Sequence, residues 1–137
     1  MRVILDTNIL VAALMVSDGP PHLLFEAFLN DRFALITSDT QIEEFSRVTR
    51  YPAVRSRIHP AQAGRLLNAV RSLSVLLEKL PPASVSRDPQ DDYLFAMAKA
   101  GDADYIVTGD KGGVLSLRKY GKTEIVTARK MVTNLKL

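Results

Sequence analysis

The sequence predicts an α/β protein with a three-layer α/β/α fold around a central, mainly parallel sheet of four or five strands. The first observation is that short apolar runs rich in β-branched residues, such as residues 3–5 and 104–108, alternate with longer segments whose apolar residues recur at helical spacing. The second is length, because 137 residues are typical of one domain and suffice to bury a core. Since no repeat or low-complexity tract divides the chain, we expect residues 1–137 to form a single domain.

The first half of the chain begins with a strand and continues mainly through helices. Pro20 and Pro21 stop the first helix, and Pro21 can open the next one because the missing N–H of proline is not needed there. The predicted elements in order are a buried strand at 3–5, a helix from residue 9, a loop at 17–21, a helix to about residue 30, a strand at 32–37 and a helix, capped by Ser38 or Asp39, that ends at the Tyr51-Pro52 pair.

The second half begins with a long amphipathic helix from Pro60. The pattern leaves open whether this helix continues to residue 79 or gives way to a short strand at 74–77. Asp88, followed by Pro89 and by an acid at position 91, is typical of a helix start. The remaining predicted elements are a loop at 80–84, that helix to about residue 101, a strand at 104–108, a loop with a short helical turn at 111–120, a strand at 124–126 and a helix at 128–135 capped by Thr127.

The composition argues against several classes of protein and site. No run of 18 apolar residues occurs, so no membrane span is expected, and Asp6 and Asn8 interrupt the apolar N-terminus, unlike in a signal peptide. We therefore expect a cytoplasmic protein. The chain has no cysteine and only two histidines, His22 and His59, which argues against thiolate and histidine-rich metal sites. A bound metal would need oxygen ligands, which points to Mg²⁺ or Mn²⁺.

Positive charge is concentrated in two segments, although the net charge is only +3. Residues 45–77 contain no acid and six arginines, and residues 111–137 contain seven Lys or Arg and one acid. A solvated basic face is the simpler interpretation of such a run. Because arginine suits phosphate, contact with a polyanion is the functional alternative.

Acidic residues stand near the ends of predicted elements, at the edge where an open α/β sheet binds ligands. Asp6 and Asp110 each follow a strand, Glu44 lies on the helix after the second strand, and Asp91 or Asp92 opens a later helix. Each acid also has a structural explanation, as a helix cap, an exposed helix acid, part of a capping box or a turn residue. Several carboxylates in one crevice repel one another unless a cation lies among them, so together they suggest a divalent metal.

Four segments taken together resemble the motifs of PIN-domain ribonucleases. They are VILDTNIL at 3–10, residues 38–48 with Glu44, RDPQDD at 87–92 followed by Ala96 and Ala98, and DYIVTGD at 104–110. The resemblance covers nearly the whole chain and is strongest to the PIN-family toxins of toxin–antitoxin systems, which are relatives of the VapC-like toxins. It implies a PIN-like fold.

The resemblance also implies a set of site residues. The metal-binding and catalytic acids would be Asp6, Glu44, Asp91 and Asp110, with Asp92 as the alternative to Asp91. Asp91 is preferred for its offset from the two alanines of the third motif, and Glu44 is preferred over its neighbour Glu43 because it directly precedes an apolar residue.

Two further residues, Asn8 and Thr108, are expected to orient carboxylates by hydrogen bonds. The chain departs from the family at one place. Many members carry another acid shortly after the fourth motif, where this chain has Gly112 and Gly113, which weakens the case for a second tightly held metal.

The implied activity is that of an Mg²⁺- or Mn²⁺-dependent endoribonuclease that hydrolyses RNA and leaves 5′-phosphate and 3′-hydroxyl ends. The implied partners are RNA, a cognate antitoxin protein and a second copy of the chain in a homodimer. Candidate contacts to the RNA backbone, which would position RNA without reading its sequence, are Arg47, Arg50, Arg55, Arg57 and Lys111. The alternatives are a PIN-fold binding or scaffold protein with a weak active site, and another acid-dependent phosphoryl-transfer enzyme such as a phosphatase or receiver-like domain.

Overall fold

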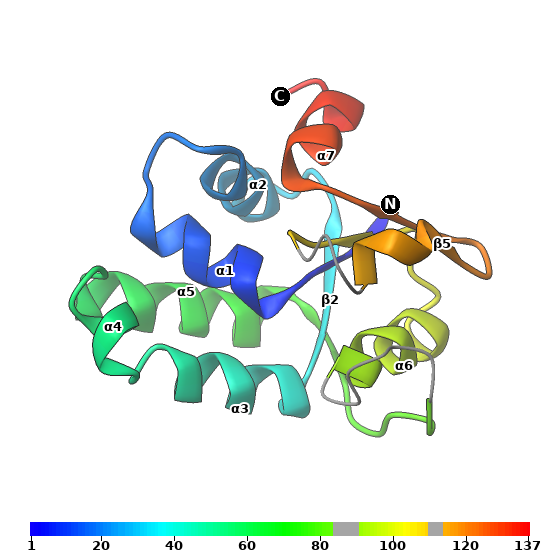
Figure 1. The fold of residues 1–137 in the computed structure, drawn as a ribbon, viewed down its shortest axis with the longest axis horizontal. Coiled ribbons are helices and arrows are strands. Elements are labelled where there is room, and N and C mark those ends of the chain that lie inside the picture. Colours follow the sequence, from blue (N-terminus) through cyan, green and yellow to red (C-terminus); the bar gives the residue numbers. More distant parts are fainter. Residues whose placement is uncertain (84–90, 110–113) are drawn as a thin grey trace.

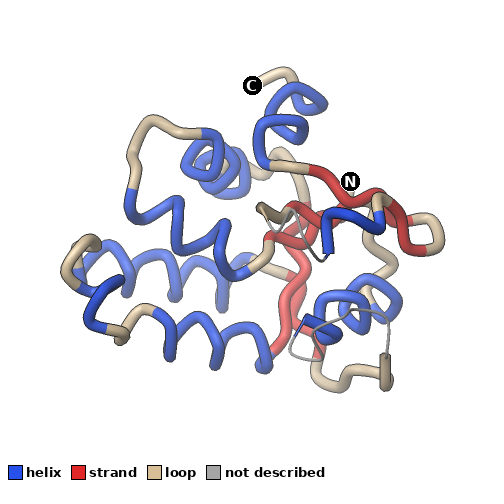
Figure 2. Tube along the Cα trace, viewed as in Figure 1, coloured by secondary structure: helices blue, strands red, loops and turns tan. Residues whose placement is uncertain are grey.

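A computed structural model describes residues 1–83, 91–109 and 114–137. The described residues form one six-stranded sheet with helices on both faces, and Figures 1 and 2 show the strands running between the helical layers. The strands are β1 (Arg2–Leu5), β2 (Ala34–Ser38), β3 (Val75–Leu77), β4 (Tyr105–Val107), β5 (Lys119–Tyr120) and β6 (Thr123–Val126). The helices are α1 (Thr7–Met15), α2 (Pro20–Leu29), α3 (Asp39–Val48), α4 (Pro52–Arg55), α5 (Pro60–Leu73), α6 (Asp92–Ala100), the short 3₁₀ helix η2 (Val114–Leu117) and α7 (Ala128–Leu135).

The sheet is mainly parallel, as the sequence predicts. Its strand order is β3-β2-β1-β4-β6-β5, and every neighbouring pair is parallel except β5 and β6. The short strand β3 follows α5, which decides between the two alternatives for residues 74–77. Strand β5 is the one strand of the six that the sequence does not predict, because its residues were expected to be part of a loop. It pairs with β6 across a tight turn in which Gly121 has a φ of 58°, a left-handed conformation that glycine adopts without strain.

Side-chain alternation along the strands divides the core into two clusters. Val3 and Leu5 of β1 face a large cluster formed with α1, α2, α3, α5 and α7. Ile4, on the opposite face, packs with Ile36 and Ile106 against α6. Because β1 lies between β2 and β4 and is covered on both faces, its apolar run is continuous rather than alternating.

Hydrogen bonds fix the carboxyl edge of the sheet, where β1, β2 and β4 end. Ser38 caps α3 by accepting a hydrogen bond from the backbone N–H of Gln41 at 3.3 Å. The buried Gln41 side chain donates from Nε2 to the carbonyl oxygen of Leu5 at 2.6 Å and accepts a bond from Thr37 Oγ1 at 2.7 Å. These contacts hold the start of α3 against the end of β1.

Helix α6 begins at Asp92, with Asp91 at its N-cap position. The helix start expected at Asp88 and Pro89 lies outside the described residues.

Over the ranges that the structure covers, no single helix is long and apolar enough to cross a bilayer, and only α1 and α2 taken together, with a 100° bend between them, meet that requirement by length and composition.

Candidate active site

Asp6 stands where β1 ends and α1 begins. It is only 7% exposed, and its Oδ2 accepts a hydrogen bond from Thr108 Oγ1 at 2.8 Å. The side chain makes no capping hydrogen bond, although the nearby backbone N–H groups of Asn8 and Thr7 favour its charged form. The side chain of Asn8 itself is exposed. A helix-capping role therefore does not account for this buried carboxylate.

The environment of Asp6 opposes its ionisation. Burial raises the pKa of its carboxyl above the ordinary value, the Thr108 hydroxyl lowers it, and the negative charge of Glu44 raises it again. Burial is the largest of these effects. A carboxyl group kept buried beside a second acid is a common arrangement at functional sites.

Glu44 extends from α3 into a cluster of hydroxyl groups. Its Oε2 accepts a hydrogen bond from Thr7 Oγ1 at 2.9 Å and another from the hydroxyl of Tyr93. The two hydroxyl groups also lie 2.9 Å from each other. Burial and the bond to Glu44 raise the pKa of Tyr93 well above its usual range, so this tyrosine remains a protonated donor. The neighbouring acid Glu43 is exposed.

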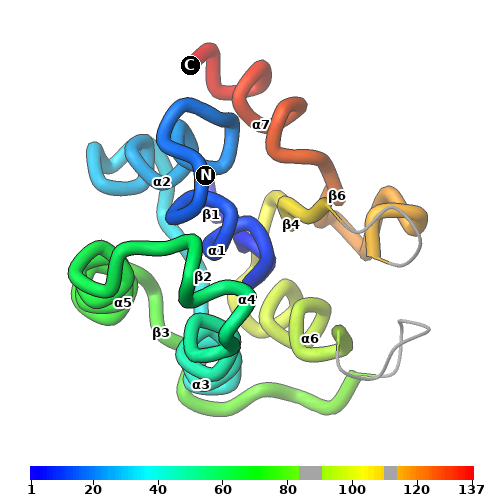
Figure 3. The backbone as a smooth tube through the Cα atoms, turned by 60° about the vertical axis from the view of Figure 1, so that its left-hand side comes forward, coloured from blue at the N-terminus to red at the C-terminus, as the bar shows by residue number. Residues whose placement is uncertain are grey.

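Thr7 and Tyr93 are not among the site residues that the sequence predicts. Thr7 belongs to the first motif, but its role depends on how closely α3 approaches the start of α1. Tyr93 follows Asp91 and Asp92 in the first turn of α6, and Figure 3 shows α6 beside α3. A tyrosine with a polar tip next to an acidic helix start is the one signal in the sequence that could have indicated it.

Of the other expected acids, the structure describes Asp91 and Asp92 but not Asp110. Asp91 and Asp92 lie partly buried at the start of α6, whereas Asp110 and Lys111 lie outside the described residues. Over 1–83, 91–109 and 114–137, no group of three or more acidic or histidine side chains is arranged to hold a metal ion. The structure thus brings two of the expected acids, Asp6 and Glu44, to one place.

The chemistry of this pair fits a hard divalent cation. The available donors are carboxylate oxygens, which Mg²⁺ and Mn²⁺ prefer, and hydroxyl groups hold each carboxylate in place. In the part of the chain that the structure describes, no Lys or Arg forms an ion pair with either acid. A bound cation would therefore neutralise negative charge that the described lysines and arginines leave uncompensated.

A cavity of about 260 Å³ opens beside Glu44. One wall is a single face of α3, because positions three, four and seven residues apart lie on the same side of a helix. Tyr93 of α6 forms the other wall, and Figures 1 and 3 show these helices side by side. The lining residues are Thr40, Glu43, Glu44, Arg47 and Tyr93.

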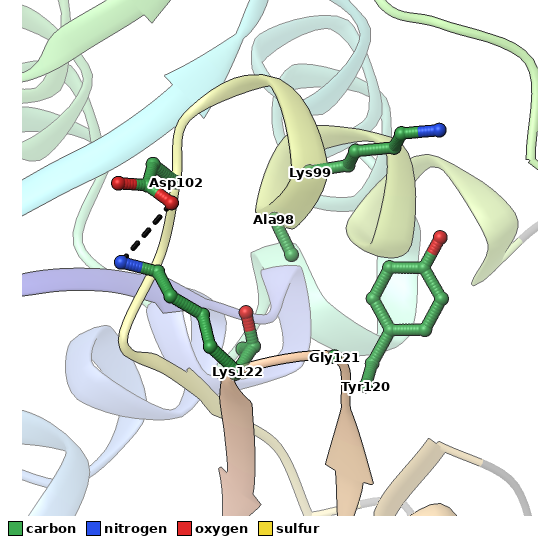
Figure 4. Close-up of a pocket in the computed structure, with 7 residues that line it drawn as sticks. Ala98, Lys99, Asp102, Tyr120, Gly121 and Lys122 are labelled. Atoms are coloured by element: carbon green, nitrogen blue, oxygen red, sulfur yellow. Dashed lines mark ion pairs between the residues drawn. The ribbon is translucent and has the colours of Figure 1, made fainter.

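A larger cavity, of about 340 Å³, lies between the end of α6 and the β5–β6 turn (Figure 4). Its residue Lys122 pairs with Asp102 at 3.0 Å and with Asp104 at 3.6 Å. Asp102 and Asp104 precede β4, so this cavity is at the amino edge of the sheet, opposite the Asp6–Glu44 pair.

The expected RNA-contacting arginines lie on and after α3. Arg47, Arg50, Arg55 and Arg57 are all exposed. Among the described residues, none of them forms an ion pair. Their guanidinium groups are therefore available to an external anion.

The fold and the site define an α/β protein with paired acids at the carboxyl edge of a mainly parallel sheet. The chain belongs to the PIN domain family, whose model matches residues 2–112. It is also similar to the uncharacterized protein MJ1680 of Methanocaldococcus jannaschii, with 27% identity over 123 residues that cover 89% of this chain and 78% of the relative. PIN domains are in general metal-dependent nucleases that act on RNA, and this membership places the chain among the nucleases, a class of hydrolases.

Proposed function

We propose that this chain is an Mg²⁺- or Mn²⁺-dependent endoribonuclease. The observation that carries the proposal is that buried Asp6 and partly buried Glu44, from different elements of a PIN domain, are held by hydroxyl groups at the carboxyl edge of the sheet. The proposed metal-binding and catalytic residues are Asp6, Glu44, Asp110 and Asp91, with Asp92 as the alternative to Asp91.

In this proposal the protein's own groups orient the site. Thr108 holds one oxygen of Asp6, and Thr7 and Tyr93 hold one oxygen of Glu44. When bound, a divalent cation supplies positive charge to the phosphoryl oxygens and favours deprotonation of the attacking water. One of the carboxylates would accept that proton, and the exposed arginines would position the RNA backbone.

The test is cleavage of total RNA with and without Mn²⁺, followed by mapping of the ends. We expect Asp6→Asn to abolish metal-dependent cleavage. Asp102→Asn is the matched control, because Asp102 lies at the opposite edge and has a positive φ of 52° that asparagine tolerates. Undiminished cleavage by D6N would show that this site is not responsible.

The ends of the products separate the proposal from its alternatives. New 5′-phosphate and 3′-hydroxyl ends support a nuclease, whereas released or transferred phosphate would indicate another phosphoryl-transfer enzyme. RNA binding without metal-dependent cleavage would indicate the scaffold alternative.

We further propose that the chain is the toxin of a type II toxin–antitoxin system, acting as a homodimer bound by an antitoxin in the cytoplasm. The support is membership of the PIN family together with the resemblance of its four motifs to such toxins. Induced expression should arrest growth of a bacterial host, and D6N should relieve the arrest while accumulating to the same level. Light scattering of the purified chain measures whether it is a dimer.

A further inference from the structure

The cavity between α3 and α6 is lined by an acid of the proposed site and by an arginine one helical turn away. Arg47 follows Glu44 by three residues, which corresponds to a rise of about 4.5 Å along the helix. Both side chains line the same cavity, with Tyr93 on the opposite wall. We call this cavity the α3–α6 groove.

Arg47 is not engaged by the acids nearest to it in sequence. Glu43 and Glu44 stand four and three positions earlier, where helical ion pairs usually form. Within the described ranges, neither comes within 4.0 Å of Arg47 to form such a pair. Glu44 is instead held by Thr7 and Tyr93, away from the guanidinium group.

A structural role explains only part of this arrangement. Arg47 is in the last turn of α3, where a positive charge interacts favourably with the helix dipole. Arg71 occupies the same place in the last turn of α5, but it does not line the groove. The dipole therefore accounts for the charge of Arg47 and not for its place on the groove wall, one helical turn after Glu44.

We propose that the α3–α6 groove binds the phosphate next to the scissile phosphate of a polynucleotide. This inference rests on the proposed function, in which the scissile phosphate lies at Asp6 and Glu44. The guanidinium group of Arg47 donates hydrogen bonds to the non-bridging oxygens of the neighbouring phosphate, a geometry that arginine suits. The preferred substrate is then a nucleic acid with at least two adjacent phosphates.

The kinetic test compares substrates that differ by one phosphate. A dinucleoside monophosphate contains only the scissile phosphate, and the same compound with an added 5′- or 3′-terminal phosphate contains a neighbour. We expect kcat/KM to be higher by about tenfold or more for one of the two longer compounds, as expected for a charge-assisted hydrogen bond. Arg47→Ala should remove this preference, Arg47→Lys should keep part of it, and Arg71→Ala should keep all of it.

A binding test makes the outcome independent of cleavage. Fluorescence anisotropy with a labelled oligoribonucleotide is measured over a series of salt concentrations in EDTA. We expect R47A to weaken binding and to reduce the slope of log K against log salt by roughly one, while R71A weakens it less.

The two tests separate failure of the groove from failure of the proposed function. Equal binding and equal substrate preference in R47A and the wild type would overturn the groove assignment even if RNA is cleaved. Loss of binding in R47A without any cleavage by the wild type would support the groove as a nucleic-acid site and overturn the nuclease.

Discussion

At the residue scale, the burial of Asp6 raises the pKa of its carboxyl group. A folded-state pKa above the unfolded value means that the native state holds a proton more tightly than the unfolded chain does. Without metal, stability should therefore fall as pH rises from the ordinary pKa of aspartate through the raised value. The contribution of Asp6 to the free energy of unfolding should therefore be smallest when its carboxyl group is ionised in the native state.

This pH dependence gives the first prediction. We expect Asp6→Asn to raise the unfolding temperature of the metal-free protein at neutral pH, because it removes the cost of a buried charge. The difference from wild type should shrink as pH falls and Asp6 becomes protonated. Thermal unfolding in EDTA from pH 4 to 8 measures both effects. A D6N protein that is less stable than wild type at neutral pH would contradict this account, and D102N is the control.

A second prediction concerns the hydrogen bond that the hydroxyl group of Tyr93 donates to Glu44. Tyr93→Phe keeps the ring and removes this donor, so Glu44 should be less well oriented. By analogy with groups that orient metal ligands, we expect about a 10- to 100-fold loss in apparent metal affinity or cleavage rate. A Mn²⁺ titration of cleavage measures it, with Tyr105→Phe at the opposite edge of the sheet as the control. An unchanged titration curve would show that Thr7 alone is enough to hold Glu44.

The sequence indicates a residue of the candidate site only where a local pattern marks it. The sequence favours Glu44 over Glu43 because of the apolar residue after it, and in the structure Glu44 is the one inside the hydroxyl cluster. Contacts between elements were not predictable, because periodicity does not give the approach of α6 to α3. For this reason Tyr93 was missed.

At the element scale, connections between helices and strands depend on close backbone approach. Gly101 ends α6 beside β2, and a Cβ atom added there would lie 2.6 Å from Ile36 Cγ2 and 2.9 Å from the carbonyl oxygen of Met97. One of these neighbours is backbone and cannot move easily. Glycine at this position therefore serves packing, since its φ of −91° is open to any residue.

The third prediction compares two glycine substitutions. Gly101→Ala should destabilise the fold by about 1–3 kcal/mol, the usual cost of overpacking. Gly64→Ala, within α5 and with no heavy atom within 4 Å of the added Cβ, should stabilise it by about 0.5–1 kcal/mol through helix propensity. Urea unfolding of both variants measures these free energies, and a neutral effect of G101A would mean that both Ile36 and the backbone at Met97 can move aside.

Elements were predictable in proportion to their length and apolar content. The central strands and long helices were expected near their observed positions, because burial on one or both faces leaves a clear hydrophobic pattern. Two short elements were not expected, β5 with two residues and α4 with four. Strands and helices of this length are stabilised by their neighbours and leave no periodic signal of their own.

At the scale of the whole molecule, parallel topology places acids from distant parts of the sequence at one edge. Asp6 follows β1 and Glu44 lies on the helix after β2, and these strands are neighbours in the sheet. The amide of Asp6 also donates to the carbonyl oxygen of Val107 at 2.9 Å, which ties the end of β1 to that of β4. The stability of the sheet edge and the geometry of the proposed site are therefore coupled.

This coupling leads to the fourth prediction. A cation that binds the native site and not the unfolded chain raises the unfolding temperature by mass action. Because Asp6 must lose its proton to bind the cation, the increase on adding Mn²⁺ should grow as pH rises through the raised pKa of Asp6. Glu44→Gln and D6N should each remove most of the increase, whereas D102N should retain it. An equal increase in D6N would mean that the cation binds and stabilises the fold at a different site. The placement of Asp6 and Glu44 at the carboxyl edge would then have to be explained by their hydrogen bonds to hydroxyl groups alone.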